Sequence, residues 1–342
     1  SVYMATVTQG GKDGYSIASA RLMEELRMQD INIQTSNQGQ KIALLFHNPY
    51  SILRLENPYR IIYTMFESDK IPEDWHDYLE AADQVIVPSK WCQKVFKKSG
   101  IETTVIPLGY DSRVFKYKRR INKRTARKDF KFLHYNAFNI RKGFPEVFKA
   151  FTQEFKQDEP VKLVLKTTLH DIPLPISKAQ YPNIEILTNP ISDNKLAELC
   201  WESDAFVFPS RGEGFGITPL EAMATGLPTI VPNAHGITEY FNAKYMYEVK
   251  VAETCPALYS RYKNQDVGKM VICDIKDLRR QMRYIYEHQN EAAKMGQLAS
   301  DYVKNWTFEK TGEKFKELFE KIYDTDIPDR PLRNVLQLEA VK

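Results

Sequence analysis

The chain of 342 residues exceeds the roughly 250–300 residues at which one hydrophobic core usually stops growing, so its length predicts two domains. With 43% hydrophobic and 27% charged residues its composition is that of an ordinary globular protein, and no apolar run approaches the roughly 18 residues of a membrane span. The net charge of +4 conceals one basic segment, residues 116–131, which contains nine Lys or Arg and one Asp.

The first residues of the chain lack the basic start and the long apolar stretch of a signal peptide. The cysteines form no C-x-x-C pair, which argues against a zinc site and against a disulfide framework. We therefore expect a cytoplasmic protein in which Cys92, Cys200, Cys255 and Cys273 serve as small apolar residues.

Strand-like runs rich in Val, Ile, Phe and Tyr alternate with amphipathic stretches along the chain. The first half predicts strands at 2–7, 41–46, 60–66, 84–87 and 103–106, and helices at 14–28, 72–82 and 90–98. The second half predicts strands at 130–135, 161–166, 184–187, 205–208 and 229–231, and helices at 145–155, 194–201 and 219–224. Such α/β alternation is typical of parallel sheets with helices on both faces.

One short pattern occurs in both halves. Residues 82–89 and residues 203–210 each contain an aspartate, a strand and then Pro-Ser, and in each half the next strand ends at a proline. Proline stops a strand at the sheet edge where loops build ligand sites. This internal similarity predicts two related Rossmann-like domains whose sheets face one cleft.

The predicted domain organisation follows from these repeats and from the basic segment. Phe308, Phe315, Phe319 and Ile322 recur at helical spacing and predict a final packing helix. We place an N-terminal Rossmann-like domain at 1–115, a basic linker at 116–129, a C-terminal Rossmann-like domain at 130–306, and a C-terminal helix and tail at 307–342.

Residues 209–228 contain the richest motif. A strand ends, glycines allow the backbone to approach a ligand closely, and Pro219 stands where the first turn of a helix tolerates proline. Free amides and the positive end of the helix dipole would hold a diphosphate. The donor-binding residues predicted here are Gly214, Phe215, Gly216, Ile217 and Thr218.

Two glutamates bracket this turn. A carboxylate suits a hydroxyl-rich ligand because it accepts hydrogen bonds from neighbouring hydroxyls. We assign Glu221 to the ribose and Glu213 to the sugar being transferred. The alternative is a glycine-rich turn with one capping and one surface glutamate.

The same segment resembles the Glu-x7-Glu signature of glycosyltransferase family 4, including Glu-Gly-Phe-Gly, Pro-Leu-Glu-Ala-Met-Ala and Gly-Leu-Pro. Residues 82–89 and 105–115 resemble the family's inter-domain strand and the end of its first domain, and residues 63–75 resemble a subgroup whose first domain is short. The resemblance implies the two-domain GT-B fold, a reaction that retains anomeric configuration, and no metal or other cofactor.

By the same resemblance, a basic pair in the first loop of the second domain meets the diphosphate. Lys142 occupies the matching position, whereas the family's arginine, five residues earlier, is replaced by Ala137. Arg141 is the candidate substitute. Without a metal, these cations would offset the charge of the leaving diphosphate.

Other site residues are also implied by the resemblance. The glycine loop after the first strand would close the site through Gly11 and Gly14, and Asn189 lies where the family contacts the base. The family's pocket histidine is absent. Glu67 is therefore the acceptor-side candidate, and His47 is interpreted as a strand-end residue.

These assignments predict a hexosyltransferase that moves a sugar from a UDP- or GDP-sugar to a hydroxyl of a glycan, glycolipid or protein. A phosphorylase or epimerase on the same fold is disfavoured by the complete Glu-x7-Glu segment and by the lack of a cofactor-like lysine. The non-enzymatic alternative is a nucleotide-sugar-binding subunit that supports a partner transferase. Ala137 and the missing histidine favour it, whereas Glu213, Glu221 and Lys142 oppose it.

The basic segment has its own alternatives. It is a solvated linker, or it docks the protein peripherally on an anionic membrane or a polyanionic acceptor. Nucleic acid is disfavoured because the segment has almost no stacking aromatics and no nucleic-acid-binding motif accompanies it.

Overall fold

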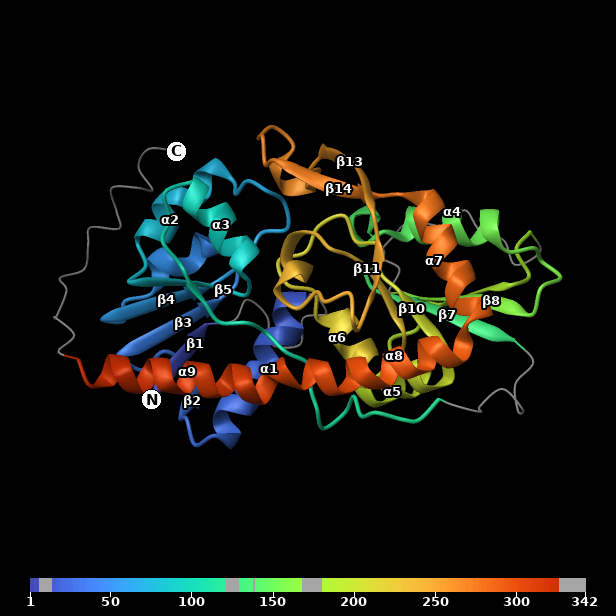
Figure 1. Cartoon of the computed structure of the whole chain (residues 1–342). Coiled ribbons are helices and arrows are strands. Elements are labelled where there is room, and N and C mark those ends of the chain that lie inside the picture. Colours follow the sequence, from blue (N-terminus) through green and yellow to red (C-terminus); the bar gives the residue numbers. More distant parts are fainter. Residues whose placement is uncertain (6–13, 121–128, 138, 168–179, 326–342) are drawn as a thin grey trace. The chain divides into compact units, whose positions relative to one another are not determined.

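A computed structural model describes residues 1–5, 14–120, 129–137, 139–167 and 180–325 (Figure 1). Its contacts divide the chain into two compact units. The first unit comprises Ser1–Leu108, Ala257–Gly268 and Phe308–Lys342, and the second comprises Gly109–Pro256 and Lys269–Thr307.

A parallel sheet of six strands forms the centre of the first unit, in the order β2-β1-β3-β4-β5-β6. The strands are β1 (Val2–Ala5), β2 (Ile33–Gln34), β3 (Ile42–Phe46), β4 (Tyr59–Tyr63), β5 (Gln84–Val87) and β6 (Thr104–Val105). Every residue of β3 is buried. A continuous apolar run of this kind is what a parallel strand needs when helices cover both faces of its sheet.

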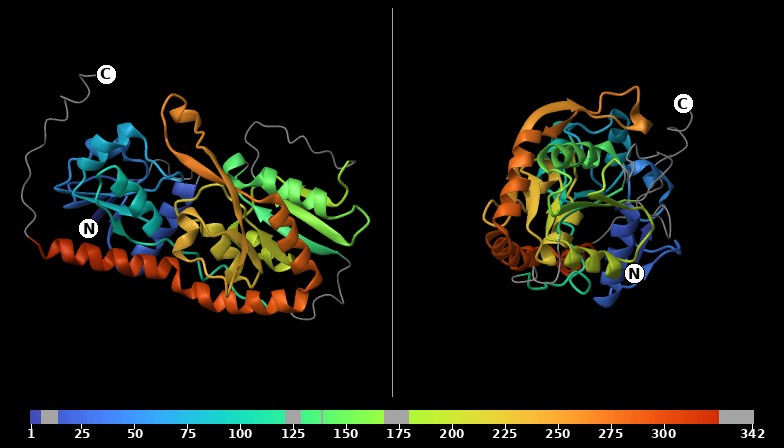
Figure 2. Two further views of the ribbon diagram at one scale, coloured as in Figure 1. Left: turned by 45° about the horizontal axis from the view of Figure 1, so that its top comes forward. Right: turned by 90° about the vertical axis from the view of Figure 1, so that its right-hand side faces the viewer.

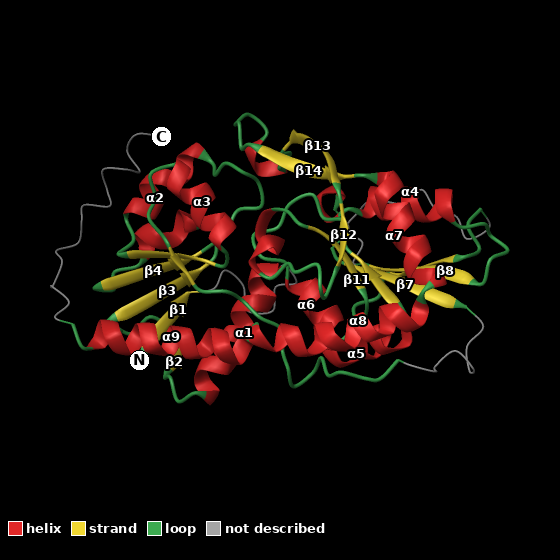
Figure 3. Cartoon of the chain, viewed as in Figure 1, coloured by secondary structure: helices red, strands yellow, loops and turns green. Residues whose placement is uncertain are grey.

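The helices of the first unit lie on both faces of this sheet (Figure 3). They are α1 (Gly14–Met28), α2 (His76–Glu80), α3 (Lys90–Lys98) and α9 (Phe308–Tyr323), with short 3-10 turns at Pro49–Arg54 and Glu73–Trp75. Helix α3 begins where the Ser89 side chain accepts a hydrogen bond from the amide of Cys92. Helix α9 packs closely on α1: a Cβ at Gly312 would lie 2.9 Å from Cγ of Glu25.

The second unit contains another parallel sheet of six strands, in the order β12-β11-β10-β7-β8-β9. The strands are β7 (Phe130–Tyr135), β8 (Val161–Lys166), β9 (Ile184–Leu187), β10 (Ala205–Val207), β11 (Thr229–Pro232) and β12 (Tyr247–Val249). Strands β8 and β9 are added on one side of β7, and β10, β11 and β12 are then added on its other side. The switch point therefore lies between β7 and β10, and ligands bind doubly wound sheets outside the carboxyl ends of such strands.

Helices cover both faces of the second sheet (Figure 3). They are α4 (Phe144–Glu154), α5 (Asp193–Glu202), α6 (Ile217–Ala224), α7 (Ile275–Glu287) and α8 (Gln289–Tyr302), with short 3-10 turns at Ile140–Lys142, His235–Glu239 and Val303–Asn305. The 3-10 turn Ser260–Tyr262 belongs to the first unit. The buried core between sheet and helices includes Phe132, Phe151, Leu163, Val207 and Met282.

An antiparallel hairpin, orange in Figure 2, lies between β12 and α7 in the chain. It consists of β13 (Val251–Pro256) and β14 (Lys269–Cys273). The two strands belong to the second unit, whereas the connecting residues, Ala257–Gly268, group with the first.

The predicted fold class, two α/β domains with parallel sheets, is confirmed. Helices 14–28 and 90–98 and strands 84–87, 130–135, 161–166 and 184–187 have the predicted bounds. The strand predicted at 60–66 ends at Tyr63. The backbone N–H and C=O of Met65 form hydrogen bonds with the hydroxyl of Tyr15 and are therefore not available to a neighbouring strand. The helix predicted at 72–82 divides into a 3-10 turn and the short α2.

The contact-based units differ from the predicted domain bounds in three segments. Residues 109–115 group with the second unit, where the backbone of Tyr110 donates to Trp306. Residues 257–268 and α9 group with the first. Each difference arises from contacts between residues far apart in the sequence. Local sequence patterns contain no information about such contacts.

The basic segment 116–131 is described only at 116–120 and 129–131. Two of its cations are bound to the second unit. The ammonium of Lys118 lies 3.6 Å from the ring centroid of Trp201, and the Arg120 guanidinium donates to the carbonyl oxygens of Cys200, Ser203 and Thr225 at the ends of α5 and α6. Among the helices of the described ranges, none has the length and apolarity to span a bilayer.

Candidate functional site

The loops that follow β7 and β10 meet at the switch point of the second sheet. Asn139 begins the short turn Ile140–Lys142 by accepting a hydrogen bond from the amide of Arg141, 2.9 Å away. Gly143 then adopts φ 81°, and a Cβ there would lie 2.3 Å from the carbonyl oxygen of Pro209. The glycine is required for both its conformation and this close approach.

Lys142 and Glu213 form the central contact of this site. The ammonium nitrogen of Lys142 lies 2.8 Å from Oε1 and 3.0 Å from Oε2 of Glu213. Both side chains are largely buried, with 17% and 7% of their surface exposed. The pair places one fixed negative charge and one cation at the carboxyl edge of the sheet.

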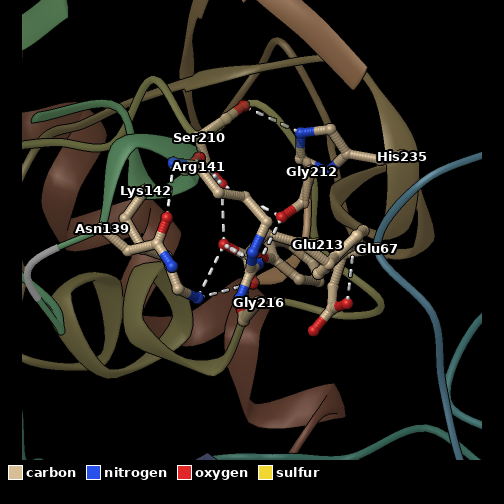
Figure 4. Close-up of polar contacts among 11 residues, drawn as sticks. Glu67, Asn139, Arg141, Lys142, Ser210, Gly212, Glu213, Gly216 and His235 are labelled. Atoms are coloured by element: carbon tan, nitrogen blue, oxygen red, sulfur yellow. Dashed lines mark hydrogen bonds and ion pairs between the residues drawn. The ribbon is translucent and has the colours of Figure 1, made fainter. Parts of the chain in front are cut away.

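Two further groups hold the Glu213 carboxylate (Figure 4). The hydroxyl of Ser210 donates to Oε1 at 2.7 Å. The guanidinium of Arg141 donates to the carbonyl oxygen of Gly212 at 2.6 Å and lies 3.5 Å from Oε1. The carboxylate therefore has a fixed position and orientation.

Glu213 is ionised although it is buried. Burial alone would raise its pKa, but the charges of Lys142 and Arg141 and the hydrogen bonds from Lys142 and Ser210 outweigh burial and hold the pKa at about 2. The site therefore keeps a carboxylate, never a carboxylic acid, at neutral pH. Such a group can accept hydrogen bonds from sugar hydroxyls and cannot donate a proton.

His235 forms a hydrogen bond with the backbone of Ser210. Its Nε2 lies 3.0 Å from the carbonyl oxygen of Ser210, and because a carbonyl only accepts, Nε2 carries the proton of the neutral ring. Burial lowers the pKa of His235 to about 4. The residue also adopts φ 43°, a left-handed conformation that is uncommon outside glycine.

The glycine-rich loop ends where α6 begins. Gly216 precedes the helix with φ 88°, and the hydroxyl of Tyr240 donates to its carbonyl oxygen at 2.6 Å. A helix leaves its first amides without partners inside the helix and carries positive potential at that end. The predicted residues Gly214, Phe215, Gly216, Ile217 and Thr218 thus surround an anion-attracting helix start.

Glu221 lies on α6 and is buried, with 3% of its surface exposed. The hydroxyl of Tyr135, at the end of β7, contacts both Oε2 of Glu221 at 3.1 Å and the carbonyl oxygen of Thr218 at 2.9 Å. This tyrosine connects the β7 end directly to the first turn of α6. Asn189 lies in the exposed loop after β9.

The remaining predicted residues lie outside the second unit. Gly14 is the first residue of α1, and Gly11 lies outside the described residues. Glu67 follows β4 and accepts a hydrogen bond from the hydroxyl of Tyr259 at 3.1 Å. The ring of His47, after β3, packs 5.0 Å from that of Tyr15.

The structure thus brings Arg141, Lys142, Glu213 and the start of α6 together. Sequence reasoning assigned no site role to Ser210, His235 or Tyr135. The pattern Pro-Ser offered no signal for Ser210, because the equivalent Ser89 merely caps a helix. The tyrosine and histidine act through contacts 86 and 25 residues away in the chain, which no local motif records.

Part of the chain is similar in sequence to known glycosyltransferases. Residues 116–253 match the model of the family described as glycosyl transferases group 1. A putative glycosyltransferase of Acidianus filamentous virus 1 is 23% identical over 215 residues, which cover 61% of this chain and 63% of that protein. The match spans less than two thirds of that relative's own length.

Solved structures share the fold across both units. Sucrose-phosphate synthase from Thermosynechococcus elongatus aligns with a TM-score of 0.70 at 14% identity, over 94% of this chain and 98% of that one. Anabaena HepE in complex with UDP and glucose aligns with a TM-score of 0.66 at 13% identity, over 94% and 99%.

The chain has the GT-B fold, with two parallel-sheet α/β units. The resemblance to group 1 glycosyltransferases is confirmed by the family match in the second unit. The assignment to family 4 stays a prediction.

Proposed function

We propose that the protein is a retaining glycosyltransferase that moves a sugar from a nucleotide-sugar donor to a hydroxyl acceptor. The observation that carries the proposal is the fixed Lys142–Glu213 pair beside the start of α6. An ionised carboxylate, a cation and a helix N-terminus are the groups needed for sugar hydroxyls and a leaving diphosphate. The match to group 1 glycosyltransferases supports the same class.

The donor is a UDP- or GDP-sugar held by the second unit. Lys142 and Arg141 meet the diphosphate together with the first amides of α6, Glu221 takes the ribose hydroxyls, and Asn189 lies on the base side. HepE, which shares the fold, binds UDP and glucose. That observation supports a nucleotide diphosphate in the equivalent part of this chain.

In the proposed reaction the bond from the anomeric carbon to the diphosphate oxygen breaks while the acceptor oxygen bonds to the same carbon from the same face. The acceptor proton passes to the leaving phosphate oxygen. Glu213 orients the sugar by accepting its hydroxyl hydrogens, and Lys142 and Arg141 stabilise the charge that develops on the diphosphate. No metal or cofactor is required in this scheme.

The acceptor is a hydroxyl of a glycan, lipid or protein, and Glu67 of the first unit is the residue proposed to bind it. We place the protein in the cytoplasm, with the basic segment as a candidate for peripheral contact with an anionic membrane. The Glu213 cluster favours catalysis over the alternative of a nucleotide-sugar-binding subunit, because binding alone does not need a carboxylate aimed at the transferred sugar.

The test is a transfer assay over a panel of UDP- and GDP-sugars, with the first-formed product examined by NMR. We expect transfer with retention, unchanged by a chelator, and a loss of roughly 10²–10³-fold in Lys142→Ala. Arg141→Ala should be less damaging, since Lys142 contacts both carboxylate oxygens. Saturable donor binding without transfer would instead support the binding-subunit alternative, and an inverted product would exclude the retaining mechanism.

A further inference from the structure

The hairpin tip Ala257–Gly268 is built into the first unit by contacts with the loop that follows β4. The hydroxyl of Ser68, which is fully buried, donates to the carbonyl oxygen of Val267 at 2.5 Å. Gly268 has φ 79°, and a Cβ there would lie 2.3 Å from Oδ1 of Asp69 and 2.8 Å from the amide nitrogen of Lys70. The far end of the tip is therefore fixed against residues 68–70.

An aromatic cluster fixes the near end of the tip. The hydroxyl of Tyr262 accepts hydrogen bonds from Nε1 of Trp75 at 3.1 Å and from the hydroxyl of Tyr50 at 3.3 Å. The buried ring of Phe66 lies 5.2 Å from Trp75 and 5.0 Å from Tyr259. These contacts hold residues 259–262 over the residue that precedes Glu67.

The consequence is a defined contact between Tyr259 and Glu67. The ring of Tyr259 packs on Phe66, and its hydroxyl donates to Oε2 of Glu67 at 3.1 Å. The backbone before Glu67 is also held at Met65, because the hydroxyl of Tyr15 donates to the carbonyl oxygen of Met65 and accepts from its amide. Glu67 is thus constrained both through its side chain and through its chain neighbours.

We propose that Tyr259 is a positioning residue that orients the Glu67 carboxylate toward a hydroxyl-bearing, carbohydrate-type acceptor. This inference rests on the proposed transferase function. A glutamate side chain has three rotatable bonds, and ordering it when the acceptor binds would cost conformational entropy. Because the ring of Tyr259 is packed, the hydrogen bond that its hydroxyl donates restricts the carboxylate before the acceptor binds.

The chemistry assigns different tasks to the two residues. Glu67, as an acceptor of hydrogen bonds, can bind neighbouring hydroxyls of a sugar. Tyr259 need not touch the acceptor, because its effect passes through the carboxylate. The hairpin tip is then a specificity element: it lies beyond the 116–253 segment that matches the transferase family, and it supplies the acceptor side with a group that the donor site does not provide.

The test compares Tyr259→Phe with Tyr262→Phe in the full chain, each alone and combined with Glu67→Gln. Both changes keep a ring and remove one hydroxyl from the same tip, but only the Tyr259 hydroxyl contacts Glu67. We expect Tyr259→Phe to lower kcat/KM for the acceptor roughly tenfold, the effect of one hydrogen bond to a charged group, and to leave the donor KM and the melting temperature nearly unchanged. In the Glu67→Gln background it should have almost no further effect.

Tyr262→Phe should lower the melting temperature, and its effect on the acceptor should multiply with that of Glu67→Gln. An unchanged acceptor kcat/KM in Tyr259→Phe, or independent effects of Tyr259→Phe and Glu67→Gln, would overturn the positioning role while wild-type transfer remained intact. Absence of transfer by the wild-type protein is a different result: it would overturn the proposed function and the role of Tyr259 with it.

Discussion

Lys142 donates to both carboxylate oxygens of Glu213, although the two residues are 71 positions apart in the chain. One is assigned to the diphosphate and the other to the transferred sugar, so the donor must engage a cation and an anion that already bind each other. Glu213 remains ionised at neutral pH because its pKa is held at about 2. Under the proposed function, the site is therefore organised before the donor binds, as electrostatic catalysis requires.

Glu213→Gln should separate binding from turnover. The amide cannot hold Lys142 by charge, so the lysine remains available to the diphosphate, and we expect UDP or GDP binding to be unchanged or slightly tighter. Turnover should fall roughly 10²–10³-fold, as for loss of one preorganised electrostatic contact. Calorimetry and steady-state transfer assays measure the two quantities. Glu146→Gln, which removes a buried carboxylate paired with Arg211, is the matched control, and unchanged turnover in Glu213→Gln would remove its assigned role.

Glu221→Ala should weaken nucleotide binding roughly 10–100-fold, because the ribose would lose a charged hydrogen-bond acceptor. Tyr135→Phe is the control for an indirect effect, since its hydroxyl contacts Glu221 and Thr218 without being assigned to the ligand. Titration of UDP or GDP by calorimetry checks both. Equal affinities of Glu221→Ala and the wild type would mean that the buried glutamate serves only the structure of α6.

We expect the titration of His235 to contribute to the pH dependence of the free energy of unfolding. Burial lowers its folded-state pKa to about 4, below the ordinary value of 6.5, so the unfolded chain binds the proton more readily. The contribution of His235 to the free energy of unfolding is then fully present above about pH 6.5. It is lost as the pH decreases toward 4, and the loss is on the order of 3 kcal/mol.

His235→Asn should reduce this pH dependence, because asparagine does not titrate and tolerates the left-handed conformation of that position. Denaturant unfolding at pH 7.5 and 4.5 provides the comparison. Parallel losses of stability in the two proteins would show that another group, such as the buried His134, controls this range.

Arg120→Ala should destabilise the second unit by about 2–4 kcal/mol. The guanidinium donates to carbonyl oxygens at the ends of α5 and α6, and its removal leaves several of these acceptors without that partner. Arg119→Ala removes the same charge from an exposed neighbour and should change the unfolding free energy by less than about 0.5 kcal/mol. Similar unfolding midpoints for both variants would refute the structural role of Arg120.

Contact of the basic segment with an anionic membrane can be tested without disturbing the fold. Neutralising Arg119, Lys123 and Arg124 together spares Lys118 and Arg120, which bind the second unit. If the segment docks on lipid, binding to acidic liposomes should decrease with salt and be lost in this variant, whereas transfer to a free acceptor should persist. Equal partitioning of variant and wild type would leave the linker interpretation.

The sequence predicted both parallel sheets except the short edge strands β2 and β12, because strands buried on both faces leave strong local patterns. The roles assigned to Lys142, Glu213 and Glu221 stay predictions. The sequence did not predict α7, α8 or the β13–β14 hairpin. It also could not separate Ser89 from Ser210, since the same dipeptide caps a helix in one unit and binds a carboxylate in the other. The Tyr259–Glu67 contact joins residues 192 positions apart and depends on packing alone.

Helix α9 has a consequence for synthesis on the ribosome. The first unit begins with β1, yet its core includes Phe315, whose ring lies 5.6 Å from that of Tyr63, and Thr311 donates to the carbonyl oxygen of Pro107. A nascent chain that has emerged only as far as Leu108 lacks these partners and exposes the apolar surface that α9 covers. The second unit, whose last residue is Thr307, has all its segments available earlier. The order of folding is therefore the reverse of the order of synthesis. The first unit can complete its core only after the ribosome has synthesised all of the second unit and then α9.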